Sequence, residues 1–156
     1  MRQCREGFIH TYLQYTKKQE SPEVFHTWTA LATISSVLRR HVWMESSGSK
    51  IEPGFYRIYP NLYVVLVSPS GVGKKSTAID LGMGLIDLSG IDINVVRGAI
   101  THTRLISRLN SALLKNPEGA AELMIFNREF KVFTKGIIQD SPLVEYLTDI
   151  FHCGKH

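Results

Sequence analysis

The sequence predicts an α/β fold in which a parallel sheet carries a glycine-rich loop, preceded by a helical region. From about residue 59 onward, short apolar runs alternate with stretches of helical periodicity, which is typical of parallel sheets. The first of these runs, Leu62–Val67, leads directly into a glycine-rich turn and then into a helical pattern. We therefore divide the chain into a helical region with a polar loop, 1–58, and a core, 59–156.

The first 42 residues have the periodicity of two helices. Apolar residues from Phe8 to Tyr15 predict a short amphipathic helix. Ser21-Pro22-Glu23 then predicts a second helix, with serine as N-cap, proline at the first helical position and an acid in the first turn. Apolar residues spaced by three and four predict its buried stripe: Phe25, Trp28, Leu31, Ile34 and Leu38. Arg39-Arg40-His41 suits the negative end of this helix, and contact with DNA is the alternative role.

The remaining elements follow from the same patterns. Trp43–Ile58 is rich in turn residues and predicts a hairpin or a loop. Helical periodicity and apolar runs predict a helix over Ser76–Leu88, a strand at Ile93–Val96, a helix over Thr103–Leu114, a strand at Leu123–Phe126 and a helix over Pro142–Phe151. The glycines inside the first of these helices, Gly82 and Gly84, indicate close packing on the sheet.

The glycine-rich turn has the features of a phosphate-binding loop, or P-loop. Backbone N–H groups of such a turn point inward, and the N-terminus of the following helix adds partial positive charge. The residues that we predict to bind a nucleotide are Ser68, Ser70, Gly71, Val72, Gly73, Lys74, Lys75, Ser76 and Thr77. We expect ATP as the ligand, with Mg²⁺ held by the Ser76 hydroxyl.

Two registers fit the usual spacing G-x-x-x-x-G-K-[ST]. With Lys74 as the phosphate lysine, Gly71 and Gly73 keep the turn glycines, but the hydroxyl comes one residue late. With Lys75 in that role, Ser76 is correctly placed, but Lys74 replaces the second glycine and Pro69 the first. The glycines favour Lys74, and both lysines stay candidates for neutralising the β- and γ-phosphates.

ATP hydrolysis also needs acidic groups at the end of a neighbouring strand. The apolar run Leu123–Phe126 is followed by Asn127, Arg128 and Glu129. Glu129 is the candidate for activating water or for binding the metal, and Asn127 can bind Mg²⁺ only through a water molecule. The usual aspartate is absent, which weakens the prediction of hydrolysis more than that of nucleotide binding.

Charge and composition point to a soluble cytoplasmic protein. The net charge is +4. Arg97 follows the predicted strand Ile93–Val96, and Arg104 and Arg108 lie four residues apart on one face of the next helix. Such a stripe can follow a nucleic-acid backbone or reach a neighbour's nucleotide. A solvated helix face is the other interpretation of these arginines. No apolar run approaches the length of a membrane span, no apolar signal core is present, and the two cysteines fit a reduced compartment.

Several segments together resemble a family of P-loop proteins of phages and mobile elements, found beside primase and replicative-helicase modules. The segments that carry the resemblance are FIHTYLQYTKKQESPEVFHTWTAL, RRHVWM, YPNLYVVLVSPSGVGKKSTAI and YLTDIFHCGK. The resemblance implies a RecA-like ATPase core, a role in replicating mobile DNA, and Lys75 as the phosphate lysine. It also implies a longer sheet than the three strands predicted here, so we expect a fragment or a shortened form.

The resulting functional hypothesis is an ATP-binding protein of mobile-element DNA replication that acts as a helicase-like ATPase when complete. We expect DNA, a second copy of the chain or a full-length homologue as partners, and no membrane. One alternative is a non-catalytic P-loop protein that regulates a full-length partner, which the missing aspartate favours. The other is a small nucleotide kinase, which the late hydroxyl of the Lys74 register favours.

Overall fold

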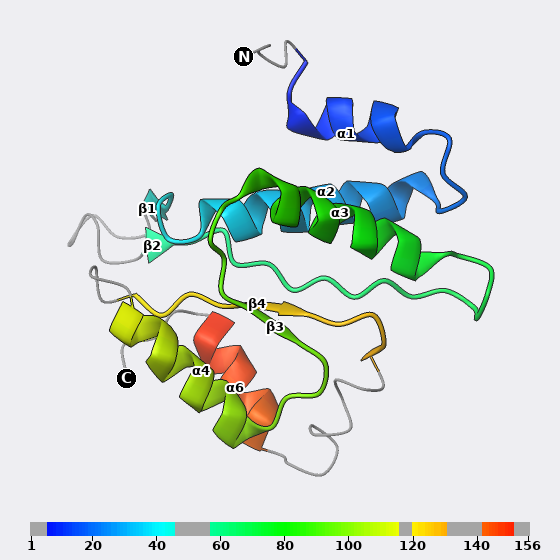
Figure 1. Ribbon diagram of the computed structural model, residues 1–156. Helices are drawn as coiled ribbons and strands as arrows, with labels where there is room; N and C mark the ends of the chain where they lie inside the picture. The colour runs from blue at the N-terminus through cyan, green and yellow to red at the C-terminus, as the bar shows by residue number, and fades with distance from the viewer. Residues whose placement is uncertain (1–5, 46–56, 116–119, 131–141, 152–156) are drawn as a thin grey trace. The chain divides into compact units, whose positions relative to one another are not determined.

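The computed structural model describes residues 6–45, 57–115, 120–130 and 142–151 (Figure 1). Two helices and two short strands come first, and helices and strands alternate from Lys75 onward. The helices are α1 (Phe8–Thr16), α2 (Glu23–Leu38), α3 (Lys75–Ser89), α4 (His102–Lys115) and α6 (Pro142–Phe151). The strands are β1 (Met44–Glu45), β2 (Arg57–Ile58), β3 (Val95–Arg97) and β4 (Met124–Phe126). Each of these helices begins and ends close to its predicted bounds.

The chain divides into two compact units, each made of two separate stretches. Unit 1 consists of Met1–Val37 and Tyr63–Asp92, and unit 2 consists of Leu38–Leu62 and Ile93–His156. This division differs from the predicted regions 1–58 and 59–156. The physical reason is that α2, from the first region, packs against the helix that follows the glycine-rich turn.

In unit 1, α2 and α3 approach each other closely at Gly82. A Cβ atom added at Gly82 would overlap the Thr29 Cγ2 atom and lie 3.0 Å from the Thr33 hydroxyl. Gly82 was predicted to pack on a sheet; it packs on a helix instead, and Gly84 has open space around it.

This close approach also changes which face of α2 is buried. The fully buried residues of the helix are His26, Thr29, Ala30 and Thr33. The predicted apolar stripe is wrong, because Trp28 is 44% exposed and its other members are half-buried. Small side chains take the contact because two helix backbones can come this near only where little lies between them.

The segment that precedes the glycine-rich turn is not a strand. Leu62–Val67 has no regular secondary structure, and Tyr63, Val65 and Val67 are exposed while Val64 and Leu66 are half-buried. The prediction of a buried strand here is therefore wrong. An apolar run becomes a strand only when a neighbouring chain takes its backbone hydrogen bonds. Within the described residues, the strand pairs are β1–β2 and β3–β4 alone.

Unit 2 contains the predicted parallel pairing. Strands β3 and β4 are parallel, with Val95 opposite Met124, Val96 opposite Ile125 and Arg97 opposite Phe126, and α4 lies between them in the sequence. A small core of Val96, Ile100 and Leu105 joins this pair to α4 and α6. The fold is therefore a mixture of helices and small sheets that includes one parallel pair, as an α/β prediction requires.

The predicted hairpin is confirmed at its two ends, where β1 and β2 pair antiparallel; residues 46–56 between them lie outside the described ranges. Two arginines stack on aromatic rings nearby. The Arg40 guanidinium lies 4.3 Å from the Tyr59 ring centre, and that of Arg57 lies 4.8 Å from the Trp43 ring centre. A hydrogen bond from Arg40 lowers the pKa of the Tyr59 hydroxyl.

Glu122 binds the two arginines that follow α2 in the sequence. The backbone N–H of Arg40 donates to its carboxylate over 3.1 Å, and the Arg39 guanidinium lies 3.5 Å from it. Arg39 itself has a left-handed backbone (φ 49°), a common way for a helix to end. Among the described helices, none is both long and apolar enough to cross a membrane.

Candidate functional site

The predicted P-loop lies in unit 1 as a turn that leads into the N-terminus of α3. The turn occupies Ser70–Gly73, and the helix begins at Lys75. The backbone N–H groups of Thr77 and Ala78 both donate to the Lys74 carbonyl, over 3.1 and 3.4 Å. The N–H groups of Lys75 and Ser76 precede these two, so they face outward from the helix start, where an anion would be stabilised.

The two candidate lysines differ in where their side chains go. The Lys75 side chain is half-buried and folds back across the loop, and its Nζ donates to the Ser68 carbonyl over 2.7 Å. The Lys74 side chain is half-exposed and its Nζ lies 3.5 Å from a carboxylate oxygen of Glu20, which is itself 77% exposed. Lys75 thus places its charge over the loop, whereas Lys74 places its charge in a surface ion pair.

The backbone conformation separates the lysines further. Lys74 is the residue before the helix and has φ 43° and ψ 40°, in the left-handed region. A side chain in this region costs about 1–2 kcal/mol, which is why glycine favours such positions. In the register with Lys75 as the phosphate lysine, Lys74 replaces a glycine. The position that the motif reserves for glycine therefore has the backbone that glycine adopts most easily.

The start of α2 supports the loop, which the sequence did not reveal. The Ser21 hydroxyl is buried and donates to the Lys74 carbonyl over 2.7 Å. α2 begins at Glu23, and the Pro22 carbonyl accepts the first hydrogen bonds, from the N–H groups of Phe25 and His26. Pro22 therefore stands at the N-cap position, and the prediction of Ser21 as N-cap is wrong by one residue. Ser-Pro-Glu is a common helix start in any sequence, so no signal distinguished capping of the helix from contact with the loop.

Gly73 is the buried centre of the loop. A Cβ atom added there would overlap the side chain of Ser68 and lie 3.0 Å from a ring carbon of Phe25. The start of α2 and the loop are thus packed without room for a side chain at this position. Gly71 has φ 77° and open space around it, so its glycine is needed for its backbone conformation alone.

The hydroxyl groups predicted to bind nucleotide or metal surround the same helix start. Ser70, Ser76 and Thr77 are exposed, as is the Val72 side chain. Ser76 follows Lys75 directly, at the position from which a hydroxyl can reach a metal ion beside a bound phosphate. Among the described residues, no group of three or more histidine, cysteine or acidic side chains is placed to hold a metal ion.

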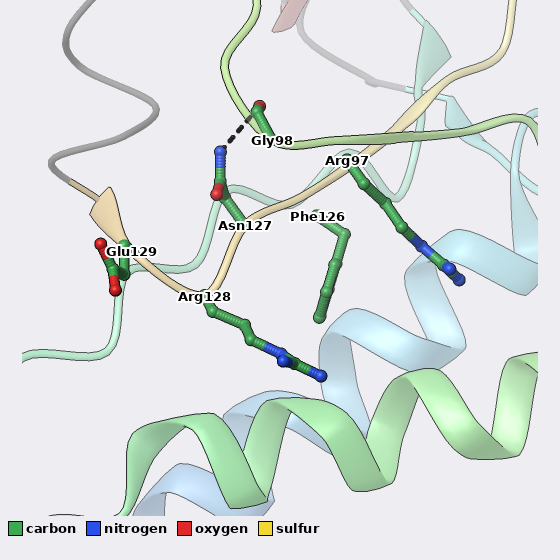
Figure 2. Close-up of a pocket in the computed structure, with 6 residues that line it drawn as sticks. All are labelled: Arg97, Gly98, Phe126, Asn127, Arg128 and Glu129. Carbon is green, nitrogen blue, oxygen red and sulfur yellow. Dashed lines mark hydrogen bonds between the residues drawn. The ribbon is translucent and has the colours of Figure 1, made fainter.

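The predicted acidic partner lies in unit 2, just beyond β4. Asn127, Arg128 and Glu129 line a pocket of about 360 Å³ together with Arg97, Gly98 and Phe126. The Asn127 amide donates to the Gly98 carbonyl over 2.9 Å and ties the two strand ends together (Figure 2). Glu129 is exposed and points away from both arginines (Figure 2). The P-loop and Glu129 thus belong to different units, and their joint action on one nucleotide stays a prediction.

Arg104 and Arg108 are both exposed on α4. They do not line the pocket. Two arginines do line it, Arg97 and Arg128. Arg97 was predicted with Arg104 and Arg108 as a possible nucleic-acid contact, whereas Arg128 was not predicted as a site residue. The signal for Arg128 in the sequence was a basic residue just beyond the strand Met124–Phe126.

Comparison of the chain with protein-family models, with curated proteins and with solved structures gives no match. The resemblance described above therefore stays a prediction.

Proposed function

We propose that this chain binds ATP at the loop Ser68–Thr77, with Lys75 as the residue that contacts the β- and γ-phosphates. The observation that carries the proposal is the pairing of a left-handed Lys74 with a Lys75 whose Nζ lies over the loop, 2.7 Å from the Ser68 carbonyl. A bound phosphate offers Nζ a charged acceptor in place of that carbonyl, and hydrogen bonds to charged groups are the stronger ones.

Three further features of the loop suit this role. The helix start supplies outward N–H groups at Lys75 and Ser76. The Ser76 hydroxyl is exposed beside them and would hold Mg²⁺, which neutralises phosphate charge when it is bound with ATP. Gly73, Phe25 and the hydroxyl of Ser21 hold the loop in shape before any ligand arrives, which lowers the cost of ordering it.

The test is a titration with a fluorescent ATP analogue and Mg²⁺, carried out on three proteins. The wild type and Lys74→Gly should bind saturably with similar affinity. Lys75→Ala should bind about 10- to 100-fold more weakly, because a hydrogen bond to a charged group is lost. The proposal fails if the folded wild type does not bind, and the choice of lysine fails if Lys74→Gly loses binding while Lys75→Ala keeps it.

We propose slow or absent turnover in the isolated chain. The end of β4 carries Asn127, whose amide is engaged by the Gly98 carbonyl, where an ATPase would place an aspartate. The remaining acid, Glu129, is exposed. Binding without turnover would favour the non-catalytic regulator of a full-length partner, and phosphate release that depends on Glu129 would favour the ATPase.

A helicase-like role in replicating phage or mobile-element DNA is the broader proposal, and it rests on the sequence resemblance alone. Its test is whether single-stranded DNA stimulates ATP hydrolysis by the chain, with Lys75→Ala as the inactive control. An unchanged rate with DNA would count against a motor role and leave ATP binding intact.

A further inference from the structure

The parallel pair β3–β4 has two faces of opposite character. Val96 is 3% exposed and pairs with Ile125, and both side chains pack into the core with α4 and α6. Side chains alternate between the faces of a strand, so the neighbouring pair Arg97 and Phe126 lies on the other face. A guanidinium group and an aromatic ring are therefore adjacent on the face that the core does not cover.

The chain beyond β4 adds a second arginine to this face. Arg128 follows Phe126 by two residues, and its side chain points the same way as that of Arg97, with the Phe126 ring between them (Figure 2). Both arginines are exposed and the phenylalanine is half-buried. The pocket that these residues line has a volume of about 360 Å³, at the lower end of the range for ligand pockets and suited to one small group.

The pocket is fixed by its own backbone. Gly98 turns the chain after β3 with φ 82°, and its carbonyl accepts the hydrogen bond from the Asn127 amide. This bond holds the ends of β3 and β4 together, so the two arginines project from a supported edge. Ligands of open parallel sheets bind at the carboxyl ends of the strands, which is where this pocket lies.

We propose that this pocket binds one nucleotide unit of a single-stranded nucleic acid. Arg97 and Arg128 would contact the phosphodiester oxygens, and the Phe126 ring would stack on the adjoining base. Planar guanidinium groups match phosphate oxygens, and aromatic side chains between basic ones are the usual platform for unpaired bases. Glu129 points away from both arginines, so its charge does not oppose the phosphate directly. This site is separate from the ATP-binding proposal, because no P-loop residue lines it.

The experiment measures fluorescence anisotropy of a labelled oligothymidylate of about 20 nucleotides, a length that covers a typical single-strand site. The pocket variant is Arg97→Gln/Arg128→Gln. The matched control is Lys17→Gln/Lys18→Gln, which removes the same charge from exposed residues that follow α1. We expect the pocket variant to bind at least about 10-fold more weakly and to lower the slope of log affinity against log salt by about 1.4, which corresponds to two phosphate contacts on a single strand. The control should change little.

Two further variants distinguish the contribution of base stacking from that of charge, and binding of DNA from binding of a free nucleotide. Phe126→Leu should weaken binding by about 10-fold with an unchanged salt slope, because it removes a stacking surface and no charge. In the Lys75→Ala background, where the P-loop is disabled, excess ATP should not displace the oligonucleotide.

Three results would overturn the proposal. They are no saturable binding by the wild type, an equal loss in the Lys17→Gln/Lys18→Gln control, or displacement by ATP in the Lys75→Ala background. The last result would assign the pocket to a free nucleotide. Circular dichroism of each variant establishes that it is folded, and a Phe126→Leu protein that does not fold leaves the arginine comparison to decide.

Discussion

Gly82 and Gly84 lie two residues apart in α3 and should respond in opposite directions to alanine. Replacing glycine by alanine inside a helix stabilises a protein by about 0.5–1 kcal/mol. Gly84 has nothing within 4 Å of an added Cβ atom, so Gly84→Ala should gain this amount. For a chain of this length, that corresponds to an increase in Tm of about 1–4 °C.

Gly82→Ala gains the same helix propensity but adds an atom where Thr29 Cγ2 already lies. Thr29 is 8% exposed and β-branched, so its side chain cannot move aside freely. The Thr33 hydroxyl, 3.0 Å from the added atom, also donates to the Thr29 carbonyl over 2.9 Å. Overpacking of this kind costs about 1–3 kcal/mol. The free energies of unfolding of Gly82→Ala and Gly84→Ala should therefore differ by about that amount, because the helix term cancels.

Urea denaturation followed by circular dichroism measures this difference. Thr29→Ser removes Cγ2 and keeps the hydroxyl, so it should restore most of the stability that Gly82→Ala loses, which a double-mutant cycle detects as a coupling energy. If Gly82→Ala and Gly84→Ala stabilise the protein equally, or if Thr29→Ser has no effect on the difference, then α2 and α3 do not meet at Gly82 as described.

The remaining predictions concern the loop and a buried histidine. Lys74→Gly should leave the free energy of unfolding unchanged or raise it by up to about 1 kcal/mol, because relief of the left-handed strain outweighs the weak surface pair with Glu20. Lys74→Val should lower it. Equal thermal unfolding of the two variants would contradict the left-handed backbone at Lys74. Gly73→Ala should destabilise the protein by about 1–3 kcal/mol and weaken ATP binding, because the added Cβ atom overlaps the Ser68 side chain. Combining it with Ser68→Gly should recover part of the stability and part of the ATP binding. No recovery would show that Ser68 does not limit the space at Gly73. His26 is 1% exposed, neither ring nitrogen has a hydrogen-bond partner in the described part of the chain, and burial lowers its pKa. The unfolded chain therefore takes up a proton near its ordinary pKa of about 6.5 while the folded chain does not, so stability should fall as pH drops through about 6.5 and level off below the folded pKa. His26→Phe should reduce the difference in the free energy of unfolding between about pH 5 and pH 8, measured by denaturation at each pH. An unchanged difference would contradict this role of His26.

The helices could be predicted from the sequence because their hydrogen bonds are local. The periodicity from Ile79 to Ile86 and from Leu105 to Leu113 is visible without knowing any neighbour. The β3–β4 pair could be predicted too, since a helix between two apolar runs brings them together in parallel. Leu62–Val67 is as apolar as either run, but a strand exists only where a partner chain is present, and the residues alone do not supply that partner.

The sequence predicts the chemistry of the candidate site but not the residues that hold its loop in place. The spacing Gly-Val-Gly-Lys-Lys-Ser indicates a phosphate loop, but it leaves two registers open. The left-handed backbone at Lys74 and the contact of Lys75 with Ser68 distinguish the two registers. Both depend on the folded conformation, which the residue types alone do not give. Likewise, the contact between Ser21 and Lys74 joins residues 53 positions apart, which no local pattern encodes.

The division into units has a consequence for any attempt to isolate one of them. The chain passes from one unit to the other after Val37, after Leu62 and after Asp92, so no single cut releases either unit whole. A truncated chain that starts at Tyr59 would keep the phosphate loop and lose α2, leaving Gly82 without Thr29 and Thr33 and Gly73 without Phe25. A chain that joins residues 1–37 to residues 63–92 through a glycine-serine linker would instead contain both stretches of unit 1 and nothing of unit 2. Such a spliced chain would let the loop be studied together with the α2 residues that it contacts.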